Sequence, residues 1–255
     1  MDACIFISTS DNTFDVFQLI GPRILKILPV TNLPLYVGLN KRVADSPFKT
    51  IQTTPSGWKT ELDRQIKSLP TDIGYVILIL DDFWFHENIE RNYLEGCIDL
   101  AKEMQADYLR LRPLERSFLI KVYRYFKGLL IKQSCAERLN QHEPYYSSLQ
   151  VAIWKRDYLL ERLKLKGNIW DFEHISPPGS RHFALTRSEL RYEHLVEKGK
   201  WYPHAPKLIG IDKDSCLFRR GFNKNLTLSN RLYHRLKFLL IGYGAFRLRK
   251  FIANR

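Results

Sequence analysis

A run of six apolar or aromatic residues that ends in two carboxylates most constrains how this chain can fold. Residues 75–80 read Tyr-Val-Ile-Leu-Ile-Leu, and Asp81 and Asp82 follow directly. A continuous apolar run of this length is typical of a strand buried on both faces, as in a parallel sheet. Such sheets bind ligands just beyond the carboxyl ends of their strands. The run therefore predicts a central strand with two acidic side chains at the ligand-binding edge.

The two adjacent carboxylates have two interpretations. Side by side they repel each other unless a metal ion or a cationic group compensates their charge. The alternative is a strand that ends in a solvated Asp-Asp turn. In a regular strand, neighbouring side chains point to opposite faces. Asp81 and Asp82 can therefore reach one ligand together only if the chain turns at Asp82.

Strand and helix patterns alternate around this run, which is typical of an α/β layer fold with a largely parallel sheet. The fold class we expect is α/β, a largely parallel sheet flanked by helices. No GxGxxG or GxxxxGK[ST] motif is present, so the dinucleotide and P-loop readings lack their glycines. The expected strands are 3–8, 33–39, 107–111 and 144–154, and the expected helices are 14–28 (interrupted at Gly21-Pro22), 58–69, 88–105 and 155–164, with a loop at 41–56 and either a strand pair or a helix at 118–131.

The positive charge of the chain is concentrated near its C-terminal end. Ten of the 13 net positive charges lie after Asp214, where there is no acidic residue. We therefore divide the chain into a domain at 1–214 and a basic segment at 215–255, whose expected partner is a polyanionic surface. The near-neutral body does not predict a nucleic-acid partner. Nucleic-acid binding through the tail alone is a third reading, and it predicts an affinity that falls steeply with salt.

The basic segment also carries apolar residues at helical spacing. Leu232, Leu236, Leu239, Leu240 and Tyr243 share one face of a helix over 229–255. This pattern predicts an interfacial helix on an anionic membrane, and a lipid-linked acceptor would suit that location. The alternative is a helix packed on the domain with its charges in water.

The cysteines bear on the cellular compartment. The four, Cys4, Cys97, Cys135 and Cys216, are far apart and form no CxxC pair. Neither a zinc site nor a disulfide framework is predicted, and a reducing cytoplasm is the expected compartment. With the basic tail, the expected localisation is cytoplasmic and peripheral on the inner face of the cell membrane.

Three further segments carry side chains suited to a nucleotide or to proton transfer. Ser8, Thr9 and Asp11 follow the first strand, where they fit a base or ribose or, equally, a helix cap. Trp58 opens a helix, where it contacts a phosphate or base or simply packs. Asp171 and Glu173 stand among large apolar side chains, which raise the pKa of a carboxyl and suit a general base. Capping of a helix N-terminus is the alternative for these two acids.

Five motifs taken together resemble one enzyme family. They are Ser8 to Asp11, Gly57-Trp58, Leu80 to Phe83, Ser148 to Trp154 and Trp170 to Glu173. In order and approximate spacing over residues 3–175 they are similar to bacterial GT-A-fold glycosyltransferases that build lipopolysaccharide, O-antigen, capsule and other surface glycans. Residues 215–255 resemble that family only loosely.

The resemblance implies a GT-A-like (Rossmann-like) sheet and transfer of a sugar from a nucleotide-diphosphate donor to an acceptor hydroxyl on a glycan or lipid-linked acceptor. It implies that Asp82 coordinates Mn²⁺ or Mg²⁺ and that Asp81 holds the ribose or a metal-bound water, although the spacer of a DxD motif is missing. Glu173 would be the general base of an inverting reaction, with Asp171 the second choice.

The resemblance assigns the remaining candidates to the donor pocket. Gln150 would shape the pocket beside Trp154, although core packing is the alternative for Trp154. Arg219 and Arg220 would close over the diphosphate. His182, His194 and His204 are candidate third metal ligands, and nothing in their spacing selects one. The alternative for the whole chain is a non-catalytic nucleotide-sugar-binding or scaffold protein on the same fold.

Overall fold

The computed structural model describes residues 2–28, 31–90, 92–113, 135–141, 146–167, 169–174, 177 and 179–223. One compact unit comprises Met1–Pro113 and Cys135–Glu193, and the described part of a second unit spans 194–223. The pattern at 118–131 and the helix predicted over 229–255 lie outside the described residues. The domain boundary predicted at residue 214 stays a prediction.

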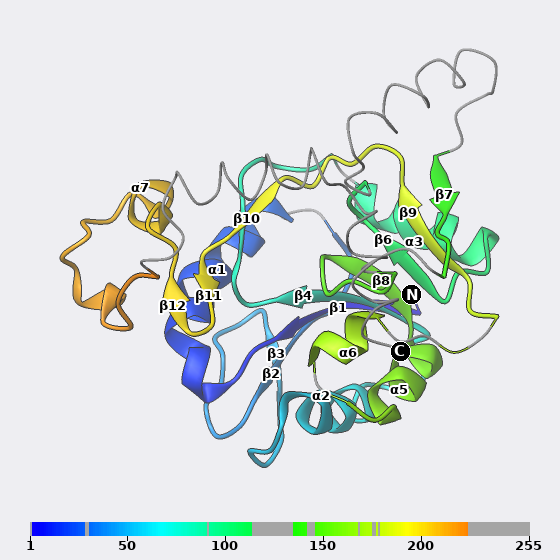
Figure 1. Ribbon diagram of the computed structural model, residues 1–255, viewed down its shortest axis with the longest axis horizontal. Helices are drawn as coiled ribbons and strands as arrows, with labels where there is room; N and C mark the ends of the chain where they lie inside the picture. The colour runs from blue at the N-terminus through cyan, green and yellow to red at the C-terminus, as the bar shows by residue number, and fades with distance from the viewer. Residues whose placement is uncertain are drawn as a thin grey trace, which may run out of the picture. The chain divides into compact units, whose positions relative to one another are not determined.

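An eight-stranded mixed sheet forms the core of the first unit (Figure 1), in the order β3-β2-β1-β4-β8-β6-β9-β7. The first four strands in this order are mutually parallel, and β8 is antiparallel to both of its neighbours. The predicted α/β class is therefore confirmed. The strands are β1 (Ala3–Ser8), β2 (Leu35–Leu39), β3 (Lys49–Gln52), β4 (Tyr75–Leu80), β6 (Tyr108–Arg110), β7 (Ala136–Arg138), β8 (Ala152–Lys155) and β9 (His182–Leu185).

The remaining elements are helices and short strand pairs. β5 (Phe83–Phe85) pairs with β10 (Tyr192–His194), and β11 (Val196–Glu197) pairs with β12 (Lys200–Trp201). None of the described helices has both the length and the apolar character needed to cross a membrane. The helices are η1 (Asp11–Thr13), α1 (Phe14–Ile27), α2 (Trp58–Lys67), α3 (Tyr93–Glu103), α5 (Arg156–Lys164), α6 (Ile169–His174), α7 (Ala205–Ile209) and η2 (Cys216–Phe218).

The predicted central strand is confirmed at both ends. β4 spans Tyr75–Leu80 and pairs in parallel with β1 along its whole length, from Ala3 opposite Tyr75 to Ser8 opposite Leu80. Residues 76–79 are buried, as expected for a strand covered on both faces. Because β1 and β4 end at the same level, the residues that follow them meet at one edge of the sheet.

The predicted break at Gly21-Pro22 is wrong, because α1 continues through Pro22. Proline in a helix interior removes one hydrogen bond and costs about 3 kcal/mol. Ile20, Ile24 and Ile27 on the same helix are fully buried. Burying one such side chain contributes about 1.5–3 kcal/mol, so the apolar face of α1 outweighs the proline.

Two predictions about strands also need correction. The expected loop at 41–56 contains β3, a short edge strand whose polar and exposed residues hide its pairing with β2. Of the residues in the expected strand at 144–154 that the structure describes, only Ala152–Trp154 adopt strand structure, as part of β8. The described residues before them, 146–151, form a segment that is held by side chains, as described below.

Helix α3 begins five residues later than the predicted start at Asn88. Asn92 before it has φ 65°, in the left-handed region. That conformation cannot continue a right-handed helix, so α3 starts at Tyr93.

Helix α2 lies close against β2 because of one glycine. The side chain of Gln65 on α2 is buried, and a Cβ added at Gly38 of β2 would lie 2.3 Å from its Oε1. Gln65 also donates to the hydroxyl of Thr53, just beyond β3. This contact fixes α2 over the carboxyl ends of β2 and β3, and so places Trp58 near the edge of the sheet.

Candidate functional site

The ends of β1 and β4 bring the first predicted residues together. The backbone N–H of Asp81 donates to the carbonyl of Ser8 at 3.2 Å, which extends the pairing of the strands by one residue. The hydroxyl of Thr9 donates to Oδ2 of Asp81 at 2.5 Å. These two residues lie 72 positions apart in sequence, so the parallel sheet creates their contact.

Asp81 is a carboxyl group in an environment that opposes its charge. Burial, opposed by hydrogen bonds from Thr13 and Thr9 and assisted by the charge of Asp82, raises the pKa of Asp81 to about 7. The hydroxyls of Thr9 and Thr13 are 3.1 Å apart, so they line the same side of the carboxyl. Near neutral pH this carboxyl is therefore close to the point at which it loses its proton.

The chain turns at Asp81 and Asp82 before it enters β5. This is the geometry on which joint use of the two carboxylates depends. Both residues keep part of their surface exposed at the end of β4, although desolvation dominates at the Asp81 carboxyl. Phe83 next to them is fully buried and packs against Tyr192, with ring centroids 4.6 Å apart, which anchors the far side of the turn.

Asp11 joins the loop after β1 to the loop after β2. Its carboxylate accepts hydrogen bonds from the backbone N–H groups of Asn40 at 2.9 Å, Lys41 at 3.0 Å and Arg42 at 3.3 Å. Desolvation acts to raise the pKa of Asp11, but these N–H groups and the charge of Arg42 outweigh it and lower the pKa. Asp11 thus fixes the shape of the edge, and its direct contact with a donor stays a prediction.

Trp58 connects β1 to α6. Its indole N–H donates to the hydroxyl of Ser8 at 3.2 Å. Its ring packs edge-on against Phe172 of α6, with centroids 5.5 Å apart. The neighbouring Lys59 donates to the carbonyls of Leu165 and Gly167 in the connection between α5 and α6. The start of α2 therefore holds α6 beside the strand ends.

The segment Tyr146–Val151, which we call the cradle, leads into β8. Because β8 is antiparallel to β4, with Ala152 opposite Leu78, the cradle lies at the edge where β4 ends. Its backbone is bound by side chains from other elements, which explains why a strand pattern yields no strand here. The contacts are Tyr146 O with His182, Ser148 O with Tyr108, Leu149 N with Glu173 and Val151 N with Tyr192.

Glu173 and Gln150 both contact the cradle. Oε1 of Glu173 accepts the N–H of Leu149 at 2.8 Å, and the backbone carbonyl of Glu173 accepts the N–H of Ser147 at 3.3 Å. Oε1 of Gln150 accepts the hydroxyl of Tyr192 at 2.7 Å. Glu173 and Gln150 therefore lie at the same edge as Asp81, and their catalytic and binding roles stay predictions.

Asp171, the second candidate for the base, lies in the first turn of α6. A Cβ added at Gly167 would lie 2.6 Å from its Oδ2, so its carboxyl packs directly on that glycine. Gly167 has φ +113°, in the region that favours glycine. The contact points Asp171 toward the connection between α5 and α6, whereas Glu173 points toward the cradle.

Several other predicted residues lie elsewhere. Trp154 is fully buried and packs on Tyr108, which confirms the core-packing alternative. His182 is fully buried, with Nδ1 against the carbonyl of Tyr146 and Nε2 against the hydroxyl of Tyr158. Burial lowers the pKa of His182 to about 3. Neither of its ring nitrogens is left for a metal ion.

The predicted residues of the second unit are His194, His204, Arg219 and Arg220. Arg219 is exposed and follows η2. Their roles toward a donor stay predictions.

Sequence reasoning missed two residues at this edge. Asn40 directly follows β2, and its amide donates to the carbonyl of Thr53 and to the carboxylate of Glu61, which ties the loops after β2 and β3 to helix α2. The feature of the sequence that could have indicated Asn40 is its position directly after a predicted strand. Tyr192 supports both Gln150 and Val151, and no local pattern in the sequence indicates it.

The carboxylates at this edge that could contact a metal ion are those of Asp81 and Asp82. In the part of the chain that the structure describes, no group of three or more His, Cys, Asp or Glu is arranged to hold one. Asp81 and Asp82 thus offer two carboxylates. Mg²⁺ usually binds one or two carboxylates and completes its shell with waters and substrate phosphates. The pair fits a cation shared with a diphosphate and does not fit a closed protein cage.

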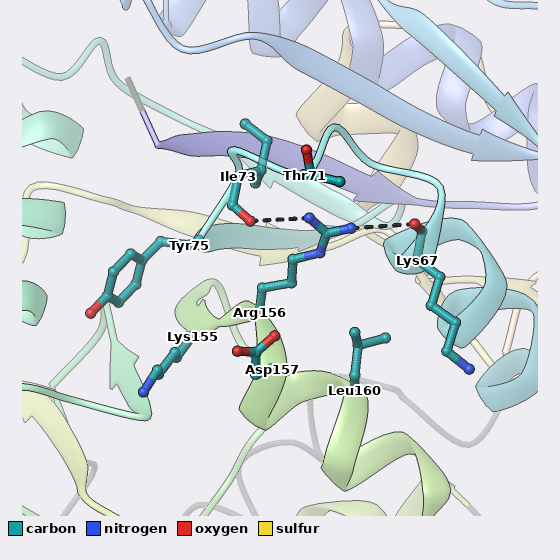
Figure 2. Close-up of a pocket in the computed structure, with 9 residues that line it drawn as sticks. Lys67, Thr71, Ile73, Tyr75, Lys155, Arg156, Asp157 and Leu160 are labelled. Carbon is teal, nitrogen blue, oxygen red and sulfur yellow. Dashed lines mark hydrogen bonds between the residues drawn. The ribbon is translucent and has the colours of Figure 1, made fainter.

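A cavity of about 420 Å³ lies at the opposite, amino-terminal edge of β4 (Figure 2). Tyr75, in its wall, is six residues from Asp81, or about 20 Å along a strand. Figure 2 shows the guanidinium of Arg156 directed at backbone carbonyls. Its fork donates to the carbonyls of Lys67, Leu69, Pro70 and Ile73 at the end of α2. Arg156 therefore secures the end of that helix, and the cavity is separate from the predicted site.

Comparisons with known proteins give structural similarity alone. No protein-family model and no curated protein matches the chain. Similar solved structures include S. aureus TarS 1-349 in complex with UDP-GlcNAc. The match has 12% sequence identity and a TM-score of 0.49, and it covers 79% of this chain and 60% of that chain. The galactosyltransferase LgtC, in complex with donor and acceptor sugar analogues, shares 11% identity over 66% of this chain and 68% of that chain, with a TM-score of 0.40.

A cytidylyltransferase from Leptospira borgpetersenii serovar Hardjo-bovis is also similar, with 11% identity, 68% coverage of each chain and a TM-score of 0.41. The chain spans 60% of the length of the TarS fragment. The similarity is one of fold, and what these proteins bind or transfer is a property of those proteins.

Proposed function

We propose that this chain is a glycosyltransferase that moves a sugar from a nucleotide-diphosphate donor to an acceptor hydroxyl. The observation that supports this most is the pair of hydrogen bonds from Thr9 to Asp81 and from Trp58 to Ser8. They join three separate motifs of the resemblance at the carboxyl edge of a parallel sheet, where such sheets bind ligands. Glu173 and Gln150 reach the same edge through the cradle.

In this proposal the loop after β1 and the start of α2 bind the nucleoside. The hydroxyls of Ser8 and Thr9 are hydrogen-bonding groups at the end of β1, and the partly exposed Trp58 ring offers a stacking face. Asp11 and Asn40 keep the adjoining loops in place through their backbone contacts. A preformed edge reduces the ordering that a donor would otherwise impose on binding.

Asp81 and Asp82 would hold Mn²⁺ or Mg²⁺. When bound, such an ion supplies electrostatic stabilisation of the negative charge that grows on a leaving diphosphate. Their part is to present two adjacent carboxylates at a turn of the chain, with Thr9 and Thr13 orienting that of Asp81. Ionised Asp81 carries more negative charge than the protonated form, so donor binding with metal should strengthen as pH rises through about 7.

Glu173 would be the general base. As the acceptor oxygen forms its bond to the anomeric carbon, the bond from that carbon to the diphosphate breaks, and the acceptor proton passes to the Glu173 carboxylate. Attack from the face opposite the leaving group inverts the anomeric centre. The bond from Leu149 N–H holds the Glu173 carboxylate at the edge of the site. Correct placement of a base contributes about 10²–10⁴-fold in rate.

The acceptor and location in the cell extend the proposal. The motif resemblance points to bacterial surface glycans such as lipopolysaccharide, O-antigen or capsule. The ten basic residues after Asp214 favour an anionic membrane surface, where a lipid-linked acceptor would be available.

A donor screen tests the proposal. Nucleotide-sugars are incubated with the protein and Mn²⁺ or Mg²⁺, and release of nucleoside diphosphate is measured with and without an acceptor.

We expect one donor class to be consumed. We expect the variants Asp82→Ala and Glu173→Gln to lose at least about 100-fold in rate while remaining folded. Lys155→Ala, on an exposed side chain at the end of β8, is the matched control and should keep full activity. Full activity of Asp82→Ala in the presence of a chelator would refute the metal role.

The alternative is a non-catalytic nucleotide-sugar-binding or scaffold protein. Calorimetry combined with the hydrolysis assay distinguishes it from a glycosyltransferase. A binding protein gives heat with a donor and Mn²⁺ but no hydrolysis and no transfer. A scaffold without a donor site gives neither heat nor hydrolysis with any nucleotide-sugar.

A further inference from the structure

Arg162 of α5 is an unusual side chain for a protein core. It is fully buried, at 0% exposure. Arginine is almost never buried to this degree unless it is paired. Among the described residues no carboxylate lies within ion-pair distance of it, and its Nε and Nη1 have no hydrogen-bond partner. Desolvation lowers the pKa of Arg162.

The contacts that Arg162 does make are with Phe172, which precedes Glu173 in the chain, and with Ser147 of the cradle. Its Nη2 donates to the backbone carbonyl of Phe172, which belongs to the peptide bond that leads into Glu173. The same nitrogen donates to the hydroxyl of Ser147 in the cradle at 2.8 Å. Its guanidinium also lies over the ring of Phe172, 4.8 Å from the centroid.

Further contacts join α6, which carries the candidate base Glu173, to the cradle. The N–H groups of Ser147 and Leu149 donate to the backbone carbonyl and the carboxylate of Glu173. Arg162 therefore joins α6 and the cradle on one side, and Glu173 joins them on the other. Helix α6 has only six residues, too few to be stable alone, and its last carbonyls need partners from outside. Arg162 supplies one of those partners.

Burying an uncompensated cation and leaving two of its nitrogens unbonded destabilises a fold. An apolar side chain of similar volume would fill the same space without that penalty. A buried group that destabilises the fold in this way is expected at a functional site, where the placement of a side chain matters more than stability. The penalty and the contacts with Phe172 and Ser147 together indicate a role in placement.

We infer that Arg162 is a positioning residue that sets the location of the Glu173 carboxylate against the cradle. This inference rests on the proposed function, in which Glu173 is the base. Arg162 acts through the backbone carbonyl of Phe172 and the hydroxyl of Ser147.

The experiment compares Arg162→Met with Arg156→Met in the full-length protein. Both arginines lie on α5 and donate to backbone carbonyls, but Arg156 serves the end of α2 at the far edge of the sheet (Figure 2). We expect Arg162→Met to lower kcat by about 10- to 100-fold with the donor KM unchanged, because a misplacement of about 1 Å can cost 10²-fold. Arg156→Met should lower the melting temperature and leave kcat within about twofold.

Amide hydrogen exchange gives a second readout that is independent of catalysis. Arg162→Met should speed exchange at the N–H groups of Leu149 and Ser147, whereas Arg156→Met should not. Arg162→Lys keeps the positive charge but lacks the planar guanidinium. Relative to Arg162→Met, it should therefore restore stability more than it restores kcat. If Arg162→Met does not fold, Ser147→Ala removes one acceptor and should still raise the exchange rate at Leu149.

Two results would overturn the inference. One is unchanged exchange at Leu149 in Arg162→Met. The other is an equal loss of kcat in Arg156→Met and Arg162→Met, which would show a general effect of stability. If the wild-type protein transfers no sugar, the proposed function fails, while the exchange measurement still decides whether Arg162 positions Glu173.

Discussion

At the scale of single residues, Asp81 links the fold to the proposed chemistry. Burial raises its pKa from the ordinary 3.8 to about 7, so the folded protein binds a proton that the unfolded chain has released. Between these two values the unfolded state holds fewer protons than the folded state. The contribution of Asp81 to the free energy of unfolding is therefore fully favourable below pH 3.8 and is lost as pH rises toward 7.

We predict that Asp81→Asn removes this pH dependence. In the wild type, the Asp81 contribution makes the free energy of unfolding fall between pH 4 and 7, and the asparagine variant should lack that fall. Chemical denaturation at half-unit pH intervals measures it. Asp2→Asn is a matched control with the opposite sign. The hydrogen bond from Lys102 lowers the pKa of Asp2, so its stabilisation is lost only in acid. An unchanged pH profile in Asp81→Asn would contradict the prediction.

At the scale of elements, one close approach sets the position of α2. We predict that Gly38→Ala destabilises the protein by about 1–3 kcal/mol, because the added methyl group would lie 2.3 Å from the buried Gln65 amide. Gln65 cannot move without losing its bond to Thr53. Equilibrium denaturation measures the change in the free energy of unfolding.

The double variant Gly38→Ala/Gln65→Ala should recover part of the loss, because it removes the side chain that the methyl group meets. Gly96→Ala, at a helical position with open space, should be neutral or stabilising by up to about 1 kcal/mol. Equal destabilisation by both single variants would show that the contact with Gln65 is not the cause.

The elements that sequence reasoning found are those with strong apolar periodicity. β4 was predicted at its observed ends because Val76 to Ile79 are apolar without interruption. The start of α2 was also found, because Gly57 and Trp58 open a clear helical pattern. β3 was missed, since an exposed edge strand such as Lys49–Gln52 carries no buried face to reveal it.

The arrangement at the strand ends was predictable in part. Parallel strands bring Ser8, Thr9 and Asp81 to one edge wherever they form, but in the sequence only the family resemblance grouped these residues. The contacts of Arg162 and Tyr192 were not predictable. Each joins segments through hydrogen bonds that depend on tertiary packing, and neither leaves a local pattern.

At the scale of the whole molecule, charge is the property with a testable consequence. We predict that the full-length protein binds vesicles that contain anionic lipid and that binding weakens with salt, because ten basic residues follow Asp214 without an acid. Co-sedimentation with vesicles that contain about 30% anionic lipid measures it.

The matched variant Arg231→Glu/Arg235→Glu should reduce vesicle binding and leave donor hydrolysis unchanged. Vesicles of neutral lipid serve as the control. Equal binding of both proteins to anionic vesicles, or binding that does not depend on salt, would contradict the prediction. Preference for duplex DNA over anionic vesicles would favour the nucleic-acid reading of the tail.

The cradle has an implication for how the protein could diversify. Its peptide groups are bound by His182, Tyr108, Glu173 and Tyr192, side chains that belong to other parts of the chain. Of these four partners, Tyr192 also donates to the side chain of Gln150, whereas His182, Tyr108 and Glu173 bind the backbone of other cradle residues. If Gln150 lines the proposed donor pocket, a substitution there would alter the pocket while most of the backbone contacts keep the loop in place.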